Sequence, residues 1–329
     1  MIRAGVPAPN LAPLMGQDTL ARRGEVAYRR LDARSLLNRC TSPRMPFEWT
    51  VNPYRGCAMG CRYCYATYTH EFLGVTTPEQ FHSLVYVKRD AEGGRETARR
   101  LASIVRRGQR IALGTATDPY QPGEAAERVT RRFLEAVAQH RGARLGIITK
   151  GSVILRDVEL LQRIHARSTL SINVSLISLR AELLRRLEPL APPPLVRIEV
   201  LRRLVAAGLD AGLSIAPVLP ALTDREQDLD ALLERAAAVG VKRVSVIPLW
   251  LRSPTKEKYL RFVEADFPRY LEAYRRAYDG RVYLGGPYRE RLRAMIERLR
   301  EKHGLTRDAH DAAPRASFGP LPEQLPLWR

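Results

Sequence analysis

Three of the four cysteines lie within eight residues of the chain, and they are the group with the clearest chemical potential. Cys57, Cys61 and Cys64 have the spacing C-x3-C-x2-C, and Gly56 and Gly60 stand directly before the first two. Three thiolates on one tight loop can each bind one iron of a [4Fe–4S] cluster and leave the fourth iron without a protein ligand. Glycine lets the backbone wrap closely around such a group. The spacing therefore predicts an iron–sulfur site with one open position.

A structural zinc site is the competing interpretation of these cysteines. Such a site needs four ligands, and only Cys40 or His70 could complete the set. The chain would then be a non-enzymatic nucleic-acid-binding protein. Four cysteines in 329 residues argue against a secreted disulfide framework and favour a reducing compartment.

The residues around the cysteines resemble a known family. Tyr63 precedes the last cysteine, and the whole motif resembles the signature of the radical S-adenosylmethionine (SAM) superfamily. Further segments resemble its spore photoproduct lyase-like (DNA repair photolyase-like) branch: 52–57 (NPYRGC), 63–66 (YCYA), 115–122 (TATDPYQP), 149–150 (TK) and 216–220 (APVLP). The resemblance covers residues 46–250.

The resemblance implies a lyase-like enzyme with two cofactors, a [4Fe–4S] cluster and SAM. The cluster would cleave SAM reductively to methionine and a 5′-deoxyadenosyl radical, which abstracts hydrogen from a substrate. An electron donor such as flavodoxin or ferredoxin would be a partner. The branch suggests a nucleic-acid substrate and DNA lesion repair, and a peptide or small metabolite is the alternative.

Parallel β/α units are expected to position this chemistry. From residue 46 onward, short β-branched runs alternate with helical patterns, which is typical of such units. Strands are predicted at 49–53, 110–115, 144–149, 170–176, 212–218 and 242–247, and helices at 95–107, 124–139, 153–165, 195–207, 225–238, 256–278 and 288–302. Because six strands are too few for a closed eight-stranded barrel, the predicted fold is α/β, a partial (β/α)6 TIM-type barrel.

Four regions are expected along the chain. Residues 1–45 would be an irregular N-terminal arm with one short helix near 31–38, and residues 46–250 the radical SAM partial barrel. Residues 251–303 would be a C-terminal helical extension, followed by a flexible tail at 304–329, which is rich in Pro and Ala.

Polar residues stand at the ends of the second and third predicted strands. Thr115, Thr117 and Asp118 could accept hydrogen bonds from the SAM ammonium group, since strand carboxyl ends face the reaction centre in β/α barrels. The alternative for Asp118 is an Asx-turn. The resemblance implies that Lys150 pairs with the SAM carboxylate, and a surface lysine is the competing interpretation.

The next two predicted strands offer further contacts to SAM. Alternation places Asn173 and Ser175 on one face of the fourth strand, where they could contact the ribose or the carboxylate. The alternative is that Asn173 and Ser175 are core residues whose polar groups form hydrogen bonds within the protein. In the fifth strand, the resemblance implies backbone and apolar contacts from Ala216 and Val218 to adenine.

Two tyrosines and one cysteine are candidates for the hydrogen-transfer steps. In the lyase, tyrosines at the positions of Tyr63 and Tyr65 belong to a hydrogen-transfer relay, whereas other superfamily members pack the first aromatic on adenine. The lyase also has a cysteine just after its second strand, where this chain has Thr115, Ala116 and Thr117. Cys40 is the one cysteine outside the loop. Either its thiol reaches the site, or hydrogen is returned to the product radical in another way, or the reaction is not thymine-dimer reversal. We prefer the last of these.

The charge of the chain indicates a polyanionic partner. The formal net charge is +19 and the isoelectric point about 10.3, which favours nucleic acid, and the resemblance to the repair branch indicates DNA. Only 6 of the 54 basic residues are lysines, so a solvated, arginine-rich surface is the simpler alternative. It would include Arg99, Arg100, Arg106 and Arg107.

The two ends of the chain suggest location and a further partner. No apolar run approaches the roughly 18 residues of a membrane span, and the N-terminus lacks a signal-peptide pattern, so a cytoplasmic location and no membrane partner are expected. The residues from Gln324 to Trp328 resemble the pentapeptide that docks on the DNA polymerase sliding clamp. The alternative is that this tail packs on its own barrel.

Overall fold

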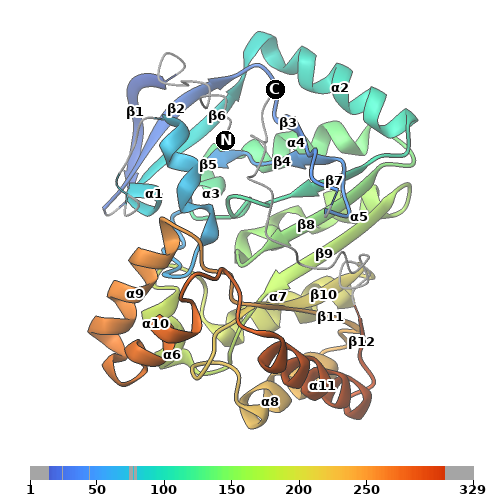
Figure 1. Cartoon of the computed structure of the whole chain (residues 1–329). Coiled ribbons are helices and arrows are strands. Elements are labelled where there is room, and N and C mark those ends of the chain that lie inside the picture. Colours follow the sequence, from blue (N-terminus) through green and yellow to red (C-terminus); the bar gives the residue numbers. More distant parts are fainter. Residues whose placement is uncertain (1–14, 24, 44, 74–76, 78–79, 308–329) are drawn as a thin grey trace.

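An open eight-stranded sheet forms the centre of the protein (Figure 1). The computed structural model describes residues 15–23, 25–43, 45–73, 77 and 80–307. The strand order is β12-β11-β10-β9-β8-β7-β4-β3, with every neighbouring pair parallel except β3 and β4. The strands are β3 (Leu37–Arg39), β4 (Trp49–Val51), β7 (Arg110–Leu113), β8 (Arg144–Thr149), β9 (Thr169–Ser175), β10 (Ala211–Val218), β11 (Arg243–Pro248) and β12 (Thr306–Arg307). The sheet does not close on itself, so the predicted partial barrel and its six parallel strands are confirmed.

Helices connect these strands and cover the sheet (Figure 1). In α8, the three- and four-residue spacing of apolar residues gives a stripe whose members, such as Leu229 and Leu233, are buried. The helices of the parallel units are α2 (Arg95–Arg106), α3 (Glu124–Glu127), α4 (Val129–Ala138), α5 (Val158–His165), α6 (Ala181–Leu187), α7 (Pro194–Ala206) and α8 (Glu226–Ala238). Since each unit returns the chain to the same end of the sheet, the strand carboxyl ends meet at one mouth.

The two faces of the parallel strands differ in character. Ile172 and Val174 of β9 are fully buried with the helices, as is Ile147 of β8. Side chains alternate along a strand, so Ile148 of β8 and Ile247 of β11 point away from the helices, and these residues are 39% and 49% exposed. The inner face of the partial barrel is therefore open at the mouth.

The N-terminal segment differs from the predicted irregular arm. A second sheet has the order β1-β2-β6-β5, from β1 (Met15–Arg23), β2 (Val26–Ala33), β6 (Leu84–Asp90) and β5 (Tyr54–Arg55). The prediction of irregular structure in residues 1–45 is wrong for β1, β2 and β3, and so is the helix expected near 31–38. Pairing of β2 with the distant β6 supplies the backbone hydrogen bonds, which local composition cannot reveal.

The C-terminal part is helical, as expected. It contains α9 (Thr255–Asp266), a short 3-10 turn at Pro268–Tyr270, α10 (Leu271–Ala277) and α11 (Gly286–Lys302). Strand β12 (Thr306–Arg307) then pairs with β11, so the flexible tail predicted from residue 304 is wrong for these residues, and residues 308–329 lie outside the described part of the chain. The expected clamp-binding peptide, Gln324 to Trp328, lies outside the described residues. Within the described chain, none of the helices combines the length and apolar character needed to cross a bilayer.

Candidate active site

The cysteine loop follows β5 at the mouth of the sheet. Gly56 and Gly60 have φ values of +90° and +73°, a conformation that L-residues rarely adopt. A Cβ on Gly56 would also lie 2.8 Å from the Leu84 carbonyl oxygen, so the backbone passes too closely for any other residue. The positions of both glycines in the motif thus have a structural reason.

Hydrogen bonds from three directions fix the backbone of this loop. Its neighbours are the residues before β6, the helical turn after β7, and the start of α9. The bonds join Cys57 N to Phe81 O (3.0 Å), Ala58 N to Gln121 Oε1 (2.9 Å), His82 Nδ1 to Cys57 O (2.9 Å), Thr117 Oγ1 to Gly56 O (2.6 Å) and Thr255 Oγ1 to Cys64 O (2.9 Å). The loop is therefore held in place by the protein itself.

The three cysteines of the loop are free thiols that lie near one another. Cys57 and Cys61 are buried and Cys64 is partly buried. Burial raises the pKa of all three, and that of Cys61 to about 12, although the charge of nearby Lys150 opposes the shift. Iron binding requires thiolates, so a bound cluster would have to offset this cost. The loop geometry and the sulfur donors fit a cluster with three cysteine ligands.

The ligand set of a structural zinc site is not found among the described residues. No three His, Cys, Asp or Glu side chains there converge on one point as a single ion requires. His70 Nε2 donates to the Leu84 carbonyl oxygen at 2.9 Å. In a cubane each cysteine binds a different iron, which does not demand such convergence.

Cys40 lies at the other end of the sheet. It follows β3, which runs antiparallel to β4, and its N–H donates to Glu48 O, just before β4 begins. The loop with the other cysteines follows the opposite end of β4. The position of Cys40 does not support the catalytic role considered for it, and burial raises the pKa of its thiol, as expected for an inert cysteine.

Asp118 joins the ends of β7 and β8. Its Oδ1 accepts hydrogen bonds from Tyr120 N at 2.9 Å and Thr149 Oγ1 at 2.6 Å, and its Oδ2 accepts from Lys150 N at 2.7 Å. The bond to Tyr120 is that of the Asx-turn, the alternative considered for this residue. In the structure, the carboxylate therefore positions the backbone that carries Lys150.

The two threonines before Asp118 also make bonds within the protein. Thr117 accepts from Gln121 Nε2 at 3.0 Å in addition to its bond to Gly56. Asn52 Nδ2 donates to Thr115 Oγ1 at 3.1 Å. These hydroxyls lie beside the cysteine loop, and their contact with SAM stays a prediction.

A buried charged cluster surrounds Tyr63. Lys150 Nζ donates to Ser175 Oγ at 2.8 Å and lies 3.7 Å from Glu188 Oε1. Glu188 also accepts from the Tyr63 hydroxyl and forms an ion pair with Arg197. The side chains of Glu188 and Arg197 are 0% and 1% exposed, so the opposite charges stabilise each other away from water.

The sequence predicts Lys150, Ser175 and Tyr63 at this place but misses Glu188 and Arg197. Glu188 lies just beyond the end of the short helix α6, outside the helical pattern of its buried leucines, so its burial left no local signal. The burial of Arg197 could have been recognised from the sequence, because it lies in the apolar stripe of α7 with Leu201 and Leu204. A charge on a buried helix face requires a partner.

The inner faces of β9 to β11 carry a polar row. Ser175 aligns with Ser214, and Ser245 Oγ donates to Ser214 Oγ at 3.0 Å. Asn173 lies one layer deeper, where its Oδ1 accepts from Arg243 at 3.4 Å. The structure thus brings Ser175 next to Lys150 and places Asn173 further from the mouth.

Ala216 and Val218, the two candidates in the fifth predicted strand, differ in their exposure to solvent. Ala216 is partly exposed, whereas the Val218 side chain is fully buried. The Val218 carbonyl oxygen accepts from Leu249 N at 3.0 Å, so this residue links the ends of β10 and β11. Their contacts with adenine remain predictions.

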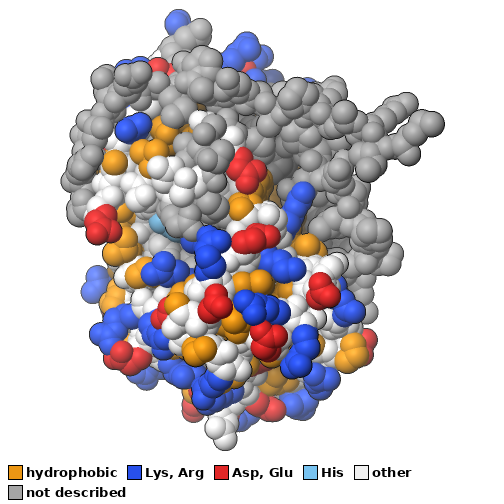
Figure 2. Space-filling model, turned by 60° about the vertical axis from the view of Figure 1, so that its left-hand side comes forward, with side chains coloured by type: hydrophobic (Ala, Val, Ile, Leu, Met, Phe, Trp, Pro, Cys, Tyr) orange, Lys and Arg blue, Asp and Glu red, His pale blue; other side chains and the backbone are white. Residues whose placement is uncertain are grey.

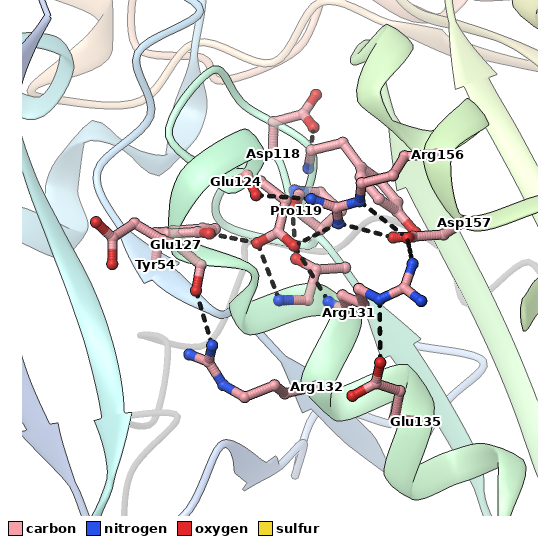
Figure 3. A network of polar contacts seen from close by, with 12 residues as sticks. Tyr54, Asp118, Pro119, Glu124, Glu127, Arg131, Arg132, Glu135, Arg156 and Asp157 are labelled. Carbon is pink, nitrogen blue, oxygen red and sulfur yellow. Dashed lines mark hydrogen bonds and ion pairs between the residues drawn. The ribbon is translucent and has the colours of Figure 1, made fainter.

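A second polar network joins β5 to the helical segments that follow β7 and β8 (Figure 3). The buried Glu124 accepts bonds from the Tyr54 hydroxyl and from Thr130 N, and it pairs with Arg156 at 2.9 Å. Arg156 also pairs with Asp157 at 2.8 Å. The network ties β5 to the helical segments after β7 and β8, so it stabilises the segments that carry the site.

Tyr65 points outward from the loop. The residue as a whole is 45% exposed, its hydroxyl donates to the Thr115 carbonyl oxygen, and its ring centroid lies 5.9 Å from that of Trp250. Tyr63, in contrast, is buried in the charged cluster. The two tyrosines of the motif therefore face different surroundings.

Comparison with known proteins extends these observations. Residues 51–236 match the radical SAM superfamily. An uncharacterised protein of Mycobacterium tuberculosis (strain ATCC 25618 / H37Rv) is 35% identical over 304 residues, which cover 92% of this chain and 88% of that protein.

Two solved structures share the fold. Spore photoproduct lyase complexed with dinucleoside spore photoproduct has a TM-score of 0.65 at 16% identity, covering 85% of this chain and 81% of that one. Streptococcus suis SuiB bound to S-adenosylmethionine has a TM-score of 0.50 at 12% identity, covering 79% and 48%. With the superfamily match spanning more than half of the sequence, the chain belongs to the radical SAM superfamily and is an enzyme that uses a [4Fe–4S] cluster and SAM.

Proposed function

We propose that this radical SAM enzyme acts on a nucleic acid, and that its substrate is a damaged or modified base in DNA. The observation that carries the proposal is the shared fold with spore photoproduct lyase over 85% of the chain, since that enzyme was solved with a dinucleoside photoproduct. The net charge of +19 supports a polyanionic partner.

The cysteine loop would hold the cluster through Cys57, Cys61 and Cys64. When bound, the cluster supplies the electron that splits SAM into methionine and a 5′-deoxyadenosyl radical. The fixed loop backbone sets the positions of the three sulfurs before iron arrives. An external reductant would deliver the electron, and a flavodoxin or ferredoxin has suitable chemistry.

Lys150 is the residue best placed to bind the carboxylate of SAM. It lies at the carboxyl end of β8, and Ser175 and Glu188 orient its ammonium group. Arg197 offsets the charge of Glu188, which leaves the positive charge of Lys150 able to attract an anion. Thr115, Thr117, Asn173 and Ala216 stay proposed contacts for the remaining groups of SAM.

The proposed substrate differs from that of thymine-dimer reversal. Thr115, Ala116 and Thr117 follow β7, where the lyase has its hydrogen-returning cysteine, and Cys40 lies at the far end of the sheet. Among the residues near the mouth, Tyr65 is the exposed hydroxyl-bearing side chain that could return a hydrogen atom. We therefore propose a lesion whose repair does not depend on a thiol.

The basic surface is compatible with phosphate binding. On the described part of the face in Figure 2, Lys and Arg side chains are spread over the surface and interleaved with Asp and Glu. Part of this charge is already paired, because Arg99 and Arg100 of α2 both bind Glu96. DNA affinity should therefore come from a subset of the 54 basic residues.

The test is binding and turnover with DNA. The reconstituted enzyme should bind double-stranded DNA with an affinity that falls steeply as salt rises, because phosphate contacts release counterions. Addition of UV-irradiated DNA should increase 5′-deoxyadenosine production above that with undamaged DNA. An affinity independent of salt and no stimulation by either DNA would overturn the proposal in favour of a peptide or small metabolite.

A further inference from the structure

Three aromatic residues from distant parts of the chain meet at the mouth of the sheet. Tyr65 follows the cysteine loop, Trp250 follows β11, and Tyr283 precedes α11. The ring centroids of Tyr65 and Trp250 lie 5.9 Å apart, and those of Trp250 and Tyr283 lie 6.5 Å apart. We call these three residues the aromatic platform.

The platform lies where a substrate must bind. Tyr65 directly follows the cluster ligand Cys64, and its hydroxyl is bonded to the backbone of Thr115 beyond the end of β7. Trp250 stands two residues beyond the end of β11, next to the strand that presents the exposed Ile247. The platform thus spans the carboxyl ends of β7 and β11, on opposite sides of the open inner face.

The three residues of the aromatic platform are more exposed to solvent than aromatic residues of the core. Tyr65 is 45% exposed, and Trp250 and Tyr283 are partly exposed. Tyrosines that do belong to the core, such as Tyr259 and Tyr278, are fully buried. Partly exposed aromatic side chains beside a reaction centre are suited to a planar ligand.

The backbone around Trp250 is fixed on both sides. Leu249 N donates to Val218 O at 3.0 Å, and Leu251 N donates to Val282 O at 2.9 Å. Both leucine side chains are buried. The indole is therefore positioned before any ligand binds, which lowers the entropic cost of binding.

Positive charge accompanies the aromatic rings. The Arg289 guanidinium lies 5.9 Å from the centroid of the Tyr283 ring. Arg252 is exposed two residues beyond Trp250. Aromatic faces combined with arginines are the combination that binds an unstacked base together with its phosphates.

We infer that the aromatic platform is a subsite for a nucleobase that has left the base stack, held beside the place where the radical forms. The inference rests on the proposed function, because it names how a nucleic-acid substrate would present its base. An enzyme that reacts with a base must take it out of the duplex or bind single strands. Stacking on Trp250 would stabilise that extruded base.

The test compares two single-stranded probes of equal charge. One is a 12-nucleotide oligothymidylate, and the other is a fully abasic strand of the same length. Substitution Trp250→Leu should weaken binding of the oligothymidylate about tenfold and leave binding of the abasic strand unchanged. The dependence of affinity on salt should stay the same, since phosphate contacts are not altered.

Two variants serve as controls. Trp250→Phe keeps an aromatic face and should retain most of the affinity. Trp49→Phe removes an indole whose Nε1 donates to Gln109 Oε1 at 2.9 Å, at the other end of the sheet, and should have no effect on either probe. Iron content and thermal unfolding, measured for each variant, show that the site itself is intact.

The outcomes separate the two claims. If the wild-type enzyme binds oligothymidylate but Trp250→Leu binds it equally well, the platform is not a base subsite and the proposed function stands. If the wild-type enzyme binds the two probes equally, the platform does not contact bases. If it binds neither probe, the platform inference falls, and double-stranded DNA binding decides the proposed function separately.

Discussion

The two sides of the mouth differ in how their side chains are used. On the cofactor side, formed by the cysteine loop and the ends of β7 to β9, Asp118, Lys150 and Glu188 are bound to other protein groups. On the side that we propose for the substrate, here called the substrate side and formed by the end of β11 and the segment before α11, Ile247 and Trp250 are partly exposed apolar residues. The difference indicates that the protein fixes the radical-forming site in advance and leaves the opposite side for a ligand to complete.

The largest expected effect comes from breaking the buried ion pair. Glu188→Gln leaves Arg197 buried without a carboxylate and should lower the free energy of unfolding by about 3–5 kcal/mol. Denaturant titration measures this change. Glu199→Gln is the matched control on the same helix as Arg197, because its partners Arg202 and Arg203 are largely exposed, and should cost less than about 1 kcal/mol. Equal effects would show that the cofactor side is not specially stabilised.

The next effect is a dependence of stability on pH. Burial lowers the pKa of His70 to about 4, below its unfolded value near 6.5. Between these values the unfolded chain binds a proton that the folded protein excludes, so stability is complete above pH 6.5 and falls as pH drops toward 4. The loss should approach about 3 kcal/mol.

Unfolding midpoints measured between pH 4 and 7 test this dependence. His70→Gln should make the curve shallower over that range, and part of the dependence that remains comes from His82, whose pKa burial lowers to about 3. A wild-type protein equally stable at pH 4.5 and pH 7 would show that His70 titrates normally, and that this part of the cofactor side is accessible to water.

A smaller effect should follow from Asp118→Asn. The amide keeps one acceptor oxygen but replaces the other with a donor that faces the Lys150 N–H, at a cost of about 1–3 kcal/mol. Because Lys150 would shift, SAM affinity measured by equilibrium binding should fall about tenfold or more. Asp32→Asn, whose partner Arg30 is exposed, should change neither quantity. Unaltered SAM binding in Asp118→Asn would separate Asp118 from the positioning of Lys150.

The smallest effect on stability is expected on the substrate side. Ile247→Ser alters a side chain in a residue that is already 49% exposed, so the free energy of unfolding should change by less than about 1 kcal/mol. Iron content and 5′-deoxyadenosine production without substrate should equal those of the wild type. A loss of iron in this variant would mean that the two sides of the mouth are not independent.

The sequence was sufficient for the parts of the protein that are governed by local patterns. The spacing of Cys57, Cys61 and Cys64 and the alternation of strands with helices predict the cysteine loop and six of the seven parallel strands, all but the short β12. The strand β2 was missed although it forms a hairpin with β1. On its other side it pairs with β6, some fifty residues further along the chain, and pairing over that distance leaves no local signal.

The hydrogen-bond and ion-pair partners of the site residues were harder to predict than the places of these residues in the fold. Asp118 was expected to face SAM, yet its oxygens bind Thr149 and the backbone of two other residues, since hydrogen-bond geometry depends on neighbouring strands. Glu188 was missed for the same reason. The apolar stripe of α7 did mark Arg197 as a buried charge that requires a partner.

The central claim is that the three clustered cysteines support SAM cleavage. Enzyme reconstituted anaerobically with iron and sulfide should produce 5′-deoxyadenosine from SAM and dithionite. Alanine at Cys57, Cys61 or Cys64 should abolish this product together with cluster iron, whereas Cys40→Ala should retain both. A fully loaded cluster that yields no 5′-deoxyadenosine, or equal loss in Cys40→Ala, would contradict the claim.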